Sequence, residues 1–320
     1  MSDLPLIQAD RAVPSPASTA TFTGGGRGRR LRLLSRTDRV VITLMVLVPL
    51  LIVVGLVWLP ALATVALSGT NWDGIGPLSE ITWVGGRNYS DVIHNYPPFQ
   101  PAIHNNLLWL AALFVVATPL GMFLAVLLDK EIRGSRFYQT ALYLPVVLSL
   151  ALIGFVWQLI YSRDQGLLNA VLGTSTDWYG DPDVNIWAVL VAAGWRHVGY
   201  IMLLYLAGLK GVDPSLREAA SVDGASETST FFRVVFPVMR PINIIVLVVT
   251  VIESLRAFDL VWVINKGRNG LELISALVTS NVVGEASRIG FGSALATIML
   301  MISLIFITAY LAVVMREDRR

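Results

Sequence analysis

The chain has 320 residues, of which 55% are hydrophobic and only 14% are charged, and its mean hydropathy is +0.66. This composition excludes an ordinary soluble domain, because long apolar runs separated by polar gaps are typical of proteins that cross a membrane several times. The formal net charge of +2 gives no sign of a nucleic-acid-binding surface, and the absence of cysteine excludes disulfides, thiolate metal sites and cysteine nucleophiles.

The amino-terminal segment, residues 1–36, is rich in Ser, Thr, Pro, Ala and Gly and ends in a cluster of arginines. Such a segment cannot bury enough apolar surface to fold, so we expect a flexible cytoplasmic tail. The apolar run that follows, residues 40–67, is about twice as long as the 7–15 apolar residues of a secretory signal. We therefore expect an uncleaved first span, with cleavage after Ala61-Leu62-Ala63 as the alternative, and one membrane domain over residues 37–320.

Further apolar runs are each long enough to cross about 30 Å of hydrocarbon as a helix. Together with the first run they predict an all-α polytopic membrane protein with six transmembrane helices. The five further runs are residues 107–128, 138–160, 186–209, 242–264 and 291–315.

The distribution of Lys and Arg predicts the orientation of these spans, because positive residues near span ends are retained in the cytoplasm. If the amino terminus is cytoplasmic, 17 Lys and Arg residues lie on the inner side and five on the outer side. We therefore expect both termini in the cytoplasm. The inner positive residues are Arg11, Arg27, Arg29, Arg30, Arg32, Arg36, Arg39, Lys130, Arg133, Arg136, Lys210, Arg217, Arg233, Arg240, Arg316, Arg319 and Arg320.

The outer gap at residues 69–103 has room for one or two short surface elements, and Pro97-Pro98 argues against a continuous helix there. The aromatic residues of the outer gaps are expected to anchor the chain at the level of the lipid headgroups.

The inner gap at residues 210–241 is longer than a turn between two spans requires. Asp213 is suited to cap a short helix, Pro214 to occupy its first position, and Gly224 to end it in a left-handed conformation. A second short helix is expected over residues 226–235. The gap is either an element that docks on a partner or an amphipathic hairpin on the membrane surface.

Several motifs of this gap and its neighbours resemble those of binding-protein-dependent ABC importer permeases. The Glu-Ala-Ala, Asp-Gly-Ala and Phe-Pro sequences of the gap resemble the loop that couples such permeases to their ATPase. The resemblance continues through the Val-Gly-Gly-Arg-Asn-Tyr sequence at 84–89, the Gly-Leu-Leu-Asn sequence at 166–169 and Phe258-Asp259. Within the family, the chain is similar to the carbohydrate (maltose-type) subgroup. The coupling residues that the resemblance implies are Glu218, Ala219, Ala220, Asp223, Gly224, Ala225, Phe231 and Pro237.

The resemblance also implies partners: a second homologous permease, two cytoplasmic ABC ATPase subunits that bind ATP and Mg, and an extracytoplasmic sugar-binding protein. The chain itself has no Gly-Lys-Ser or Gly-Lys-Thr sequence that would cradle a phosphate, so we expect a non-catalytic transport subunit without a cofactor. It departs from many relatives at residues 265–270, where a Gly-Gly-Pro turn is absent. This departure leaves the coupling loop unaffected but weakens any inference about the outer loops or the particular sugar.

Charged and aromatic residues inside the predicted spans are candidates for a substrate pathway, since such groups normally face a protein interior or a water-filled cavity. Glu253, Arg256 and Asp259 have helical spacing and are expected on one face of the fifth span. The alternative is a structural network of salt bridges, or pairing with the partner permease. The candidates are Trp157, Tyr161, Arg196, Tyr200, Glu253, Arg256 and Asp259.

Two other function classes compete with this interpretation. A secondary transporter driven by an ion gradient could use the intramembrane acids Glu253 and Asp259 as carriers of protons or sodium. No Ser/His pair at the spacing of a protease motif supports a membrane protease as the function. No spacing of His residues suggests a metal site. The basic residues of the tail would hold the orientation or contact anionic lipid.

Overall fold

The computed structural model describes residues 35–130, 133–284 and 287–317, so most of the predicted tail and the terminal Arg319 and Arg320 lie outside the described residues. One isolated β-bridge joins Thr70 and Trp83, and the regular elements of the described residues are helices. The chain divides into two compact units, Met1–Val57 and Trp58–Arg320.

The described helices are numbered in chain order, with η marking 3-10 and π-helices. They are α1 (Arg36–Val53), η1 (Val54–Trp58), α2 (Leu59–Leu67), η2 (Leu78–Glu80), α3 (Arg87–Ser90), η3 (Asp91–Asn95), α4 (Phe99–Ala112), η4 (Leu113–Ala117), α5 (Thr118–Asp129), α6 (Ser135–Val147), α7 (Leu150–Ile160), α8 (Leu167–Leu172), α9 (Asn185–Lys210), α10 (Pro214–Val222), α11 (Glu227–Thr230), η5 (Phe231–Val235), α12 (Phe236–Val238), α13 (Arg240–Leu255), α14 (Asp259–Asn265), α15 (Ile274–Val282) and α16 (Ile289–Glu317).

The first unit contains helix α1, whose start is fixed by a capping box. The Ser35 hydroxyl accepts a hydrogen bond from the Asp38 amide at 3.1 Å, and the Asp38 carboxylate accepts one from the Ser35 amide at 3.0 Å. These bonds satisfy backbone donors that a helix start leaves without partners. The predicted first span therefore begins just before the apolar run, at Arg36.

Four helical stretches are long and apolar enough to cross a membrane: Arg36–Leu67, Phe99–Asp129, Asn185–Lys210 and Ile289–Ala309. Two further pairs of helices qualify if each bent pair counts as one span, which gives up to six spans within the described residues. The predicted all-α polytopic fold is thus confirmed.

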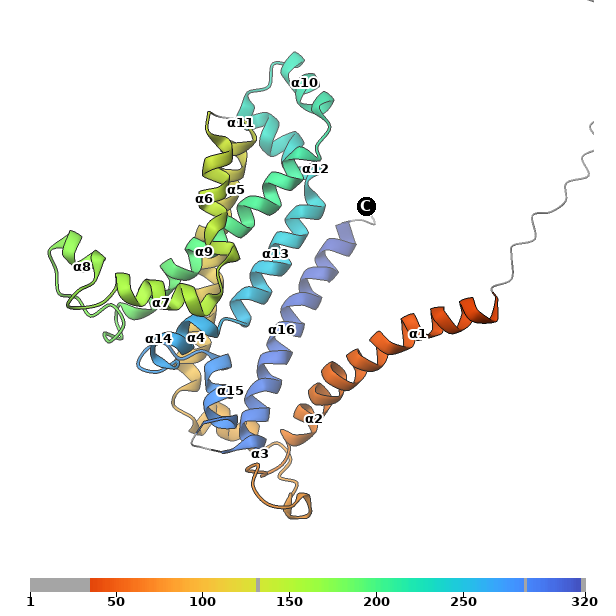
Figure 1. Cartoon of the computed structure of the whole chain (residues 1–320), viewed down its shortest axis with the longest axis vertical. Helices are drawn as coiled ribbons and strands as arrows, with labels where there is room; N and C mark the ends of the chain where they lie inside the picture. Colours follow the sequence, from red (N-terminus) through yellow and green to blue (C-terminus); the bar gives the residue numbers. More distant parts are fainter. Residues whose placement is uncertain (1–34, 131–132, 285–286, 318–320) are drawn as a thin grey trace, which may run out of the picture. The chain divides into compact units, whose positions relative to one another are not determined.

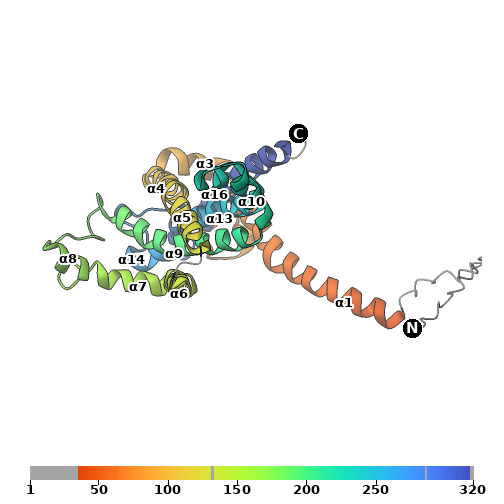
Figure 2. The same cartoon turned by 90° about the horizontal axis from the view of Figure 1, so that it is seen from above.

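The third predicted span is not one straight helix, which corrects the expectation for residues 138–160. Helices α6 and α7 meet at an angle of 104°. Leu148 and Ser149 are extended, and the Ser149 hydroxyl accepts a hydrogen bond from the Leu152 amide at 3.2 Å, so the chain restarts a helix instead of continuing one. Both views of the second unit show α7 and α8 extending away from the helices α5, α9 and α13 (Figure 1, Figure 2).

Helix α9 passes through the second unit and packs closely against α5 and α6. A Cβ atom added to Gly121 of α5 would lie 2.8 Å from the carbonyl oxygen of Val198, and one added to Gly199 of α9 would lie 2.2 Å from the carbonyl oxygen of Leu142. Glycine at these two contacts lets the backbones approach, as small residues do between membrane helices.

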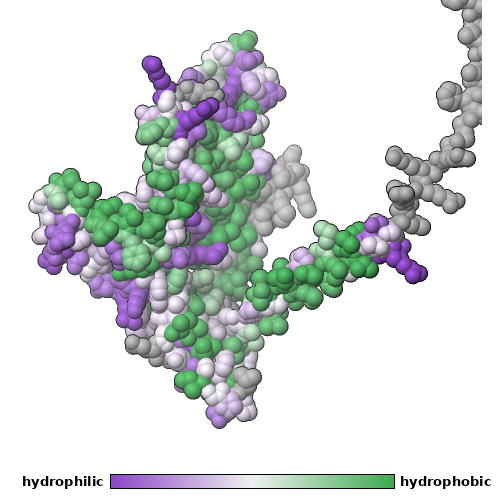
Figure 3. All heavy atoms as spheres, viewed as in Figure 1, coloured by the Kyte–Doolittle hydropathy of each residue, from purple (hydrophilic) through white to green (hydrophobic). Residues whose placement is uncertain are grey.

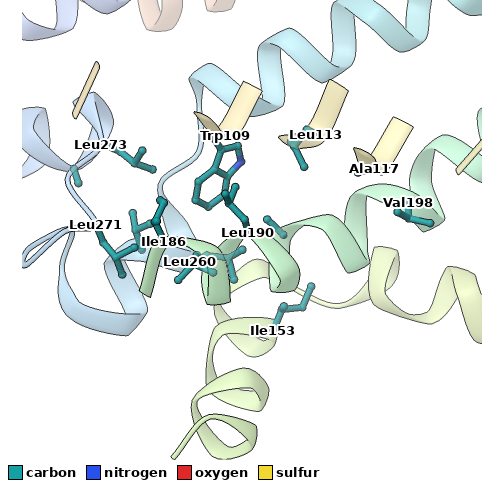
Figure 4. Close-up of a cluster of buried hydrophobic side chains, with 14 residues drawn as sticks. Trp109, Leu113, Ala117, Ile153, Ile186, Leu190, Val198, Leu260, Leu271 and Leu273 are labelled. Atoms are coloured by element: carbon teal, nitrogen blue, oxygen red, sulfur yellow. The ribbon is translucent and has the colours of Figure 1, made fainter. Parts of the chain in front are cut away.

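The largest buried apolar cluster lies where the long helix of α4 and η4 faces α9. Trp109 and Leu113 point toward Ile186 and Leu190 of α9, and Leu260 of α14 completes the cluster (Figure 4). Hydrophobic side chains also cover much of the visible surface of the second unit, and hydrophilic ones lie at the end that carries α10 as well as on the side of α7 and α8 (Figure 3). An exposed apolar surface of this extent is what a membrane-spanning unit requires.

Candidate functional site

Helix α10 lies at one end of the second unit, and its two ends form as the sequence predicts (Figure 1). The Asp213 carboxylate accepts a hydrogen bond of 2.9 Å from the Ser215 amide, and this bond lowers the pKa of Asp213 below its ordinary value of 3.8. Pro214 occupies the first turn. Beyond Asp223, which caps the carboxyl end, Gly224 is left-handed with φ of +74°. The Ala225 amide then donates to the Ala220 carbonyl at 3.0 Å, which closes the helix end.

Much of α10 is left uncovered by the other described residues. Glu218 and Ala219 are exposed, and Val222 is 87% exposed although it is apolar. A Cβ atom added to Gly224 would have no neighbour within 4 Å. Ala220 is different, because it is only 8% exposed and lies on the side of α10 that faces its own loop. The arrangement is a projecting helix with a partly apolar surface, which fits a docking element.

The segment after α10 is helical from Glu227 to Val238, which is longer than the predicted 226–235, and its middle turn is the π-helix η5. Phe231 packs with Phe232 and Phe236 in a small aromatic group, with ring centroids 5.0 and 6.1 Å from that of Phe231. Pro237 lies in the first turn of α12 and is exposed. The aromatic group lies on the segment that leads from the loop into α13.

Asp129, at the last position of α5, holds α10 in place. Its side chain is only 9% exposed, and its carboxylate accepts a hydrogen bond of 2.8 Å from the Arg217 guanidinium of α10. The Lys210 ammonium, at the end of α9, lies 3.4 Å from the other carboxylate oxygen. One carboxylate thus links α10 to the ends of the two long helices α5 and α9. Sequence reasoning missed Asp129, because its partners are remote in the chain.

A second ion pair joins the other arm of the loop to α5. The Lys130 ammonium lies 2.5 Å from the Glu227 carboxylate, and both side chains are at least half exposed. Lys130, Lys210 and Arg217, which the charge count assigns to the inner side, therefore meet at the α10 end of the second unit.

Some of the predicted pathway residues surround a small cavity between α4, α9, α13 and α14. Arg196 and Glu253 form an ion pair of 3.4 Å, and Arg256 and Asp259 also line the cavity. The cavity volume is about 40 Å³, which is room for a few water molecules. A sugar does not fit there, so a substrate path through these residues requires a different conformation or a wall supplied by another chain.

The predicted single helix face of Glu253, Arg256 and Asp259 is wrong. Helix α13 ends at Leu255, Arg256 has φ of −90° and ψ of 3°, and a new helix starts at Asp259. The break, and not helical spacing, brings all three residues to one cavity. Nor do they form the alternative salt-bridge network, since among the described residues Glu253 pairs with Arg196.

The other three predicted pathway residues lie elsewhere. Trp157 and Tyr161 stack on each other with ring centroids 5.0 Å apart, and they belong to an aromatic group with Trp195, Trp178 and Tyr179. Tyr200 packs partly buried against a separate apolar cluster that includes Met202 and Tyr205. Neither set lines the cavity.

Among the residues at or next to the cavity, Trp109, His197, Thr250 and Thr118 were not in the predicted set. Trp109 and His197 line it, and His197 Nε2 lies 3.2 Å from the hydroxyl of Thr250, which in turn lies 3.4 Å from that of Thr118. The only sequence signal for them is that polar residues recur in several spans at a similar depth. Which of these side chains meet could not be read from spacing along one helix.

Comparisons with known proteins identify relatives of the chain. Residues 117–318, which include α10 and the whole loop, match the family of binding-protein-dependent transport system inner membrane components. A probable ABC transporter permease protein of Pyrococcus horikoshii is 31% identical over 273 residues, which is 83% of this chain and 92% of that protein. The xylose/arabinose import permease protein XacH of Haloferax volcanii is 33% identical over 257 residues, which is 77% of this chain and 79% of that protein.

A solved structure supports the fold independently of close sequence similarity. A chain in the crystal structure of a bacterial ABC transporter involved in the import of the acidic polysaccharide alginate superposes with a TM-score of 0.74. The superposition covers 88% of this chain and 96% of that chain at 18% sequence identity. The helical arrangement of the second unit is therefore one that an ABC importer uses.

Proposed function

The chain belongs to the family of binding-protein-dependent transport system inner membrane components, and we propose that the substrate it moves is a sugar. As a permease subunit of an ABC importer it is a multi-pass inner membrane protein and a non-catalytic component of transport. The resemblance of its motifs to importer permeases is thereby confirmed.

The observation that carries the proposal is the α10 loop inside the matched region. Helix α10 projects from the end of the unit, exposes Glu218 and Ala219, and is tied through Arg217 and Asp129 to α5. A docked ATPase could therefore move the long helices by moving α10. We propose two cytoplasmic ATPase subunits, which bind ATP and Mg, as the source of energy for alternating access.

The sugar specificity rests on relatives and on chemistry. The Haloferax relative is a xylose/arabinose import permease. The cavity beside α13 offers carboxylate and guanidinium groups that can exchange hydrogen bonds with hydroxyls. Because this cavity is too small for a sugar, a second, homologous permease is proposed to complete the path, and an extracytoplasmic sugar-binding protein is proposed to deliver the substrate.

The orientation of the chain is also a proposal. If α10 meets a cytoplasmic ATPase, the end of the unit that carries Lys130, Lys210 and Arg217 faces the cytoplasm, in agreement with the charge count. Both termini would then be cytoplasmic, and anionic lipid of the inner leaflet would meet the basic residues near the span ends.

Reconstitution in liposomes tests the function. The complex co-purified with the chain is supplied with the binding protein and with radiolabelled arabinose, xylose or a short oligosaccharide. We expect uptake to require both ATP inside the vesicle, on the side of α10, and the binding protein. Uptake driven by a proton or sodium gradient without ATP would instead establish a secondary transporter.

A further inference from the structure

A second cavity lies at the end of the second unit opposite α10, near α3 (Figure 1). Its volume is about 390 Å³, within the range of about 300–1,000 Å³ that small-molecule sites occupy. We call it the distal pocket. Its lining residues come from the segment after α2, from α3 and η3, and from the start of α16, and they include Trp72, Asp73, Arg87, Asp91, Tyr96 and Arg288.

The walls of the distal pocket are fixed by hydrogen bonds between segments that are far apart in the sequence. The Asn88 side-chain amide donates to the carbonyls of Ser68 and Thr70 at 2.8 and 2.7 Å. The Gly290 amide donates to the Trp72 carbonyl at 2.8 Å. A Cβ atom added to Gly290 would lie 2.1 Å from the Thr70 carbonyl oxygen, so this contact requires glycine. The pocket is therefore a built feature of the fold and not a gap between loose loops.

The charges of the pocket lining balance. Asp73 and Asp91 supply two carboxylates, and Arg87 and Arg288 supply two guanidinium groups. Arg87 lies 3.8 Å from Asp91 and is largely exposed, which leaves most of its donors available. A site with balanced charges does not favour an anion or a cation, but it offers both donors and acceptors to a neutral molecule.

Aromatic side chains complete the lining, and one of them, Trp72, has a buried donor without a partner. Tyr96 packs edge-on against Phe291, with ring centroids 5.1 Å apart, beneath the Arg288 guanidinium. The indole Nε1 of Trp72 is buried and has no hydrogen-bond partner among the described residues. A buried donor without a partner costs free energy, and a bound hydroxyl would remove that cost.

From this geometry we propose that the distal pocket binds a neutral, hydroxyl-rich small molecule, with the chemistry of a sugar ring. It would be a site separate from the cavity beside α13, at the end of the permease that the proposed orientation places outside the membrane. A sugar held there would be concentrated at the entrance of the path.

The absence of cysteine from the chain allows a direct test. In the purified complex, without binding protein and without nucleotide, Asn95→Cys places a thiol in the pocket lining and Ile93→Cys places one on the same short helix at a residue outside it. The rate of maleimide labelling of this subunit is measured with increasing D-glucose or maltose. We expect either sugar to slow labelling at position 95 and to leave position 93 unchanged.

A second variant tests the Trp72 donor. Trp72→Phe removes the indole N–H while keeping an aromatic ring, and we expect it to raise the sugar concentration that gives half-protection by about 3-fold to 10-fold. Trp83→Phe, at an exposed tryptophan outside the lining, should leave that concentration unchanged. This assay needs no transport, so its result is independent of whether sugar uptake is established.

Three results would overturn the proposal. Absence of protection by either sugar would mean that the pocket takes no sugar. Equal protection by succinate or choline would contradict a neutral ligand. Protection by the extracytoplasmic binding protein alone, without sugar, would show that the pocket receives a protein side chain instead.

Discussion

The carboxylate of Asp129 accepts a 2.8 Å hydrogen bond from the guanidinium of Arg217, although 88 positions separate the two residues in the chain. The contact joins the last residue of α5 to the middle of α10. Helix α5 directly follows η4, which carries Leu113, and η4 follows α4, which carries Trp109. Both of these residues line the cavity beside α13. One continuous helical stretch therefore connects α10, through the Asp129 contact, with the cavity that holds candidate pathway residues.

We expect Asp129→Asn to weaken coupling. The substitution leaves Arg217 and Lys210 without their shared carboxylate, and a hydrogen bond to a charged group contributes about 1.5–3 kcal/mol. Because Arg217 is 40% exposed, we expect the lower end of that range. The measurement is substrate-stimulated ATPase activity of the reconstituted complex, together with uptake.

Lys130→Gln is the matched control for Asp129→Asn. Its partner Glu227 is 84% exposed, and ion pairs exposed to water are screened and contribute little to stability. Activity should therefore change little. If Lys130→Gln impaired coupling as strongly as Asp129→Asn, the special role of Asp129 would be refuted.

Gly224 supplies a second prediction, about the end of α10. Its φ of +74° is unfavourable for most side chains, although the space around it is open. We expect Gly224→Val to shift the helix end and to abolish ATPase stimulation, whereas Gly224→Asn should keep most of it, because Asn adopts the left-handed conformation more readily. Equal loss in both variants would indicate a clash with a docked partner and not backbone strain.

The local features of the α10 loop could be predicted from sequence because they depend on neighbours in the chain. The Asp213 cap, Pro214 at the helix start and the left-handed Gly224 all follow short-range rules. The contacts of Asp129 and of Glu253 could not be predicted, since each partner lies on another helix. The break after Leu255 was missed for a related reason: no Gly or Pro marks it.

The bend between α6 and α7 could be predicted from the sequence only in part. Pro145 lies in this run and signals a possible interruption, but α6 continues past it to Val147. The apolar pattern alone predicts one span, because a run of apolar residues does not indicate where the chain changes direction. Ser149 supplies the cap that starts the next helix at Leu150.

The third prediction concerns pH. The pKa of Asp213 is lowered in the folded state by the Ser215 hydrogen bonds, so the stabilisation from its charged form is present above the ordinary pKa of 3.8. It is lost as the pH falls through the lowered value. The protection factors of the α10 amides, measured by hydrogen exchange in lipid nanodiscs and corrected for the intrinsic effect of pH on exchange, should therefore be constant between pH 5 and 8. They should fall in more acidic solution.

Substitutions separate the charge of Asp213 from its capping role. Asp213→Asn retains an acceptor for the Ser215 amide and should abolish the acid-induced loss of protection. Asp213→Ala removes the acceptor and should lower protection at every pH. A pH response that persisted unchanged in Asp213→Asn would assign it to another group.

The fourth prediction concerns orientation. A reporter that functions only in the cytoplasm should be active when fused after Arg320, and a reporter that functions only outside should be active when inserted near Asp177. These outcomes follow from the excess of Lys and Arg in the segments assigned to the inner side. The reverse pattern at both positions would place α10 outside and would contradict docking on a cytoplasmic ATPase.

The last prediction addresses the ion pair between Arg196 and Glu253. If the two groups line the substrate path, Arg196→Gln and Glu253→Gln should each reduce uptake while the complex still assembles, because both side chains are partly exposed at the cavity. The exchange Arg196→Glu with Glu253→Arg restores the pair but reverses its direction. A merely structural pair should tolerate the exchange, whereas a pair that orients hydroxyls should not. Recovery of full uptake in the exchanged variant, or loss of assembly in the single variants, would show that the pair serves the fold and not the substrate.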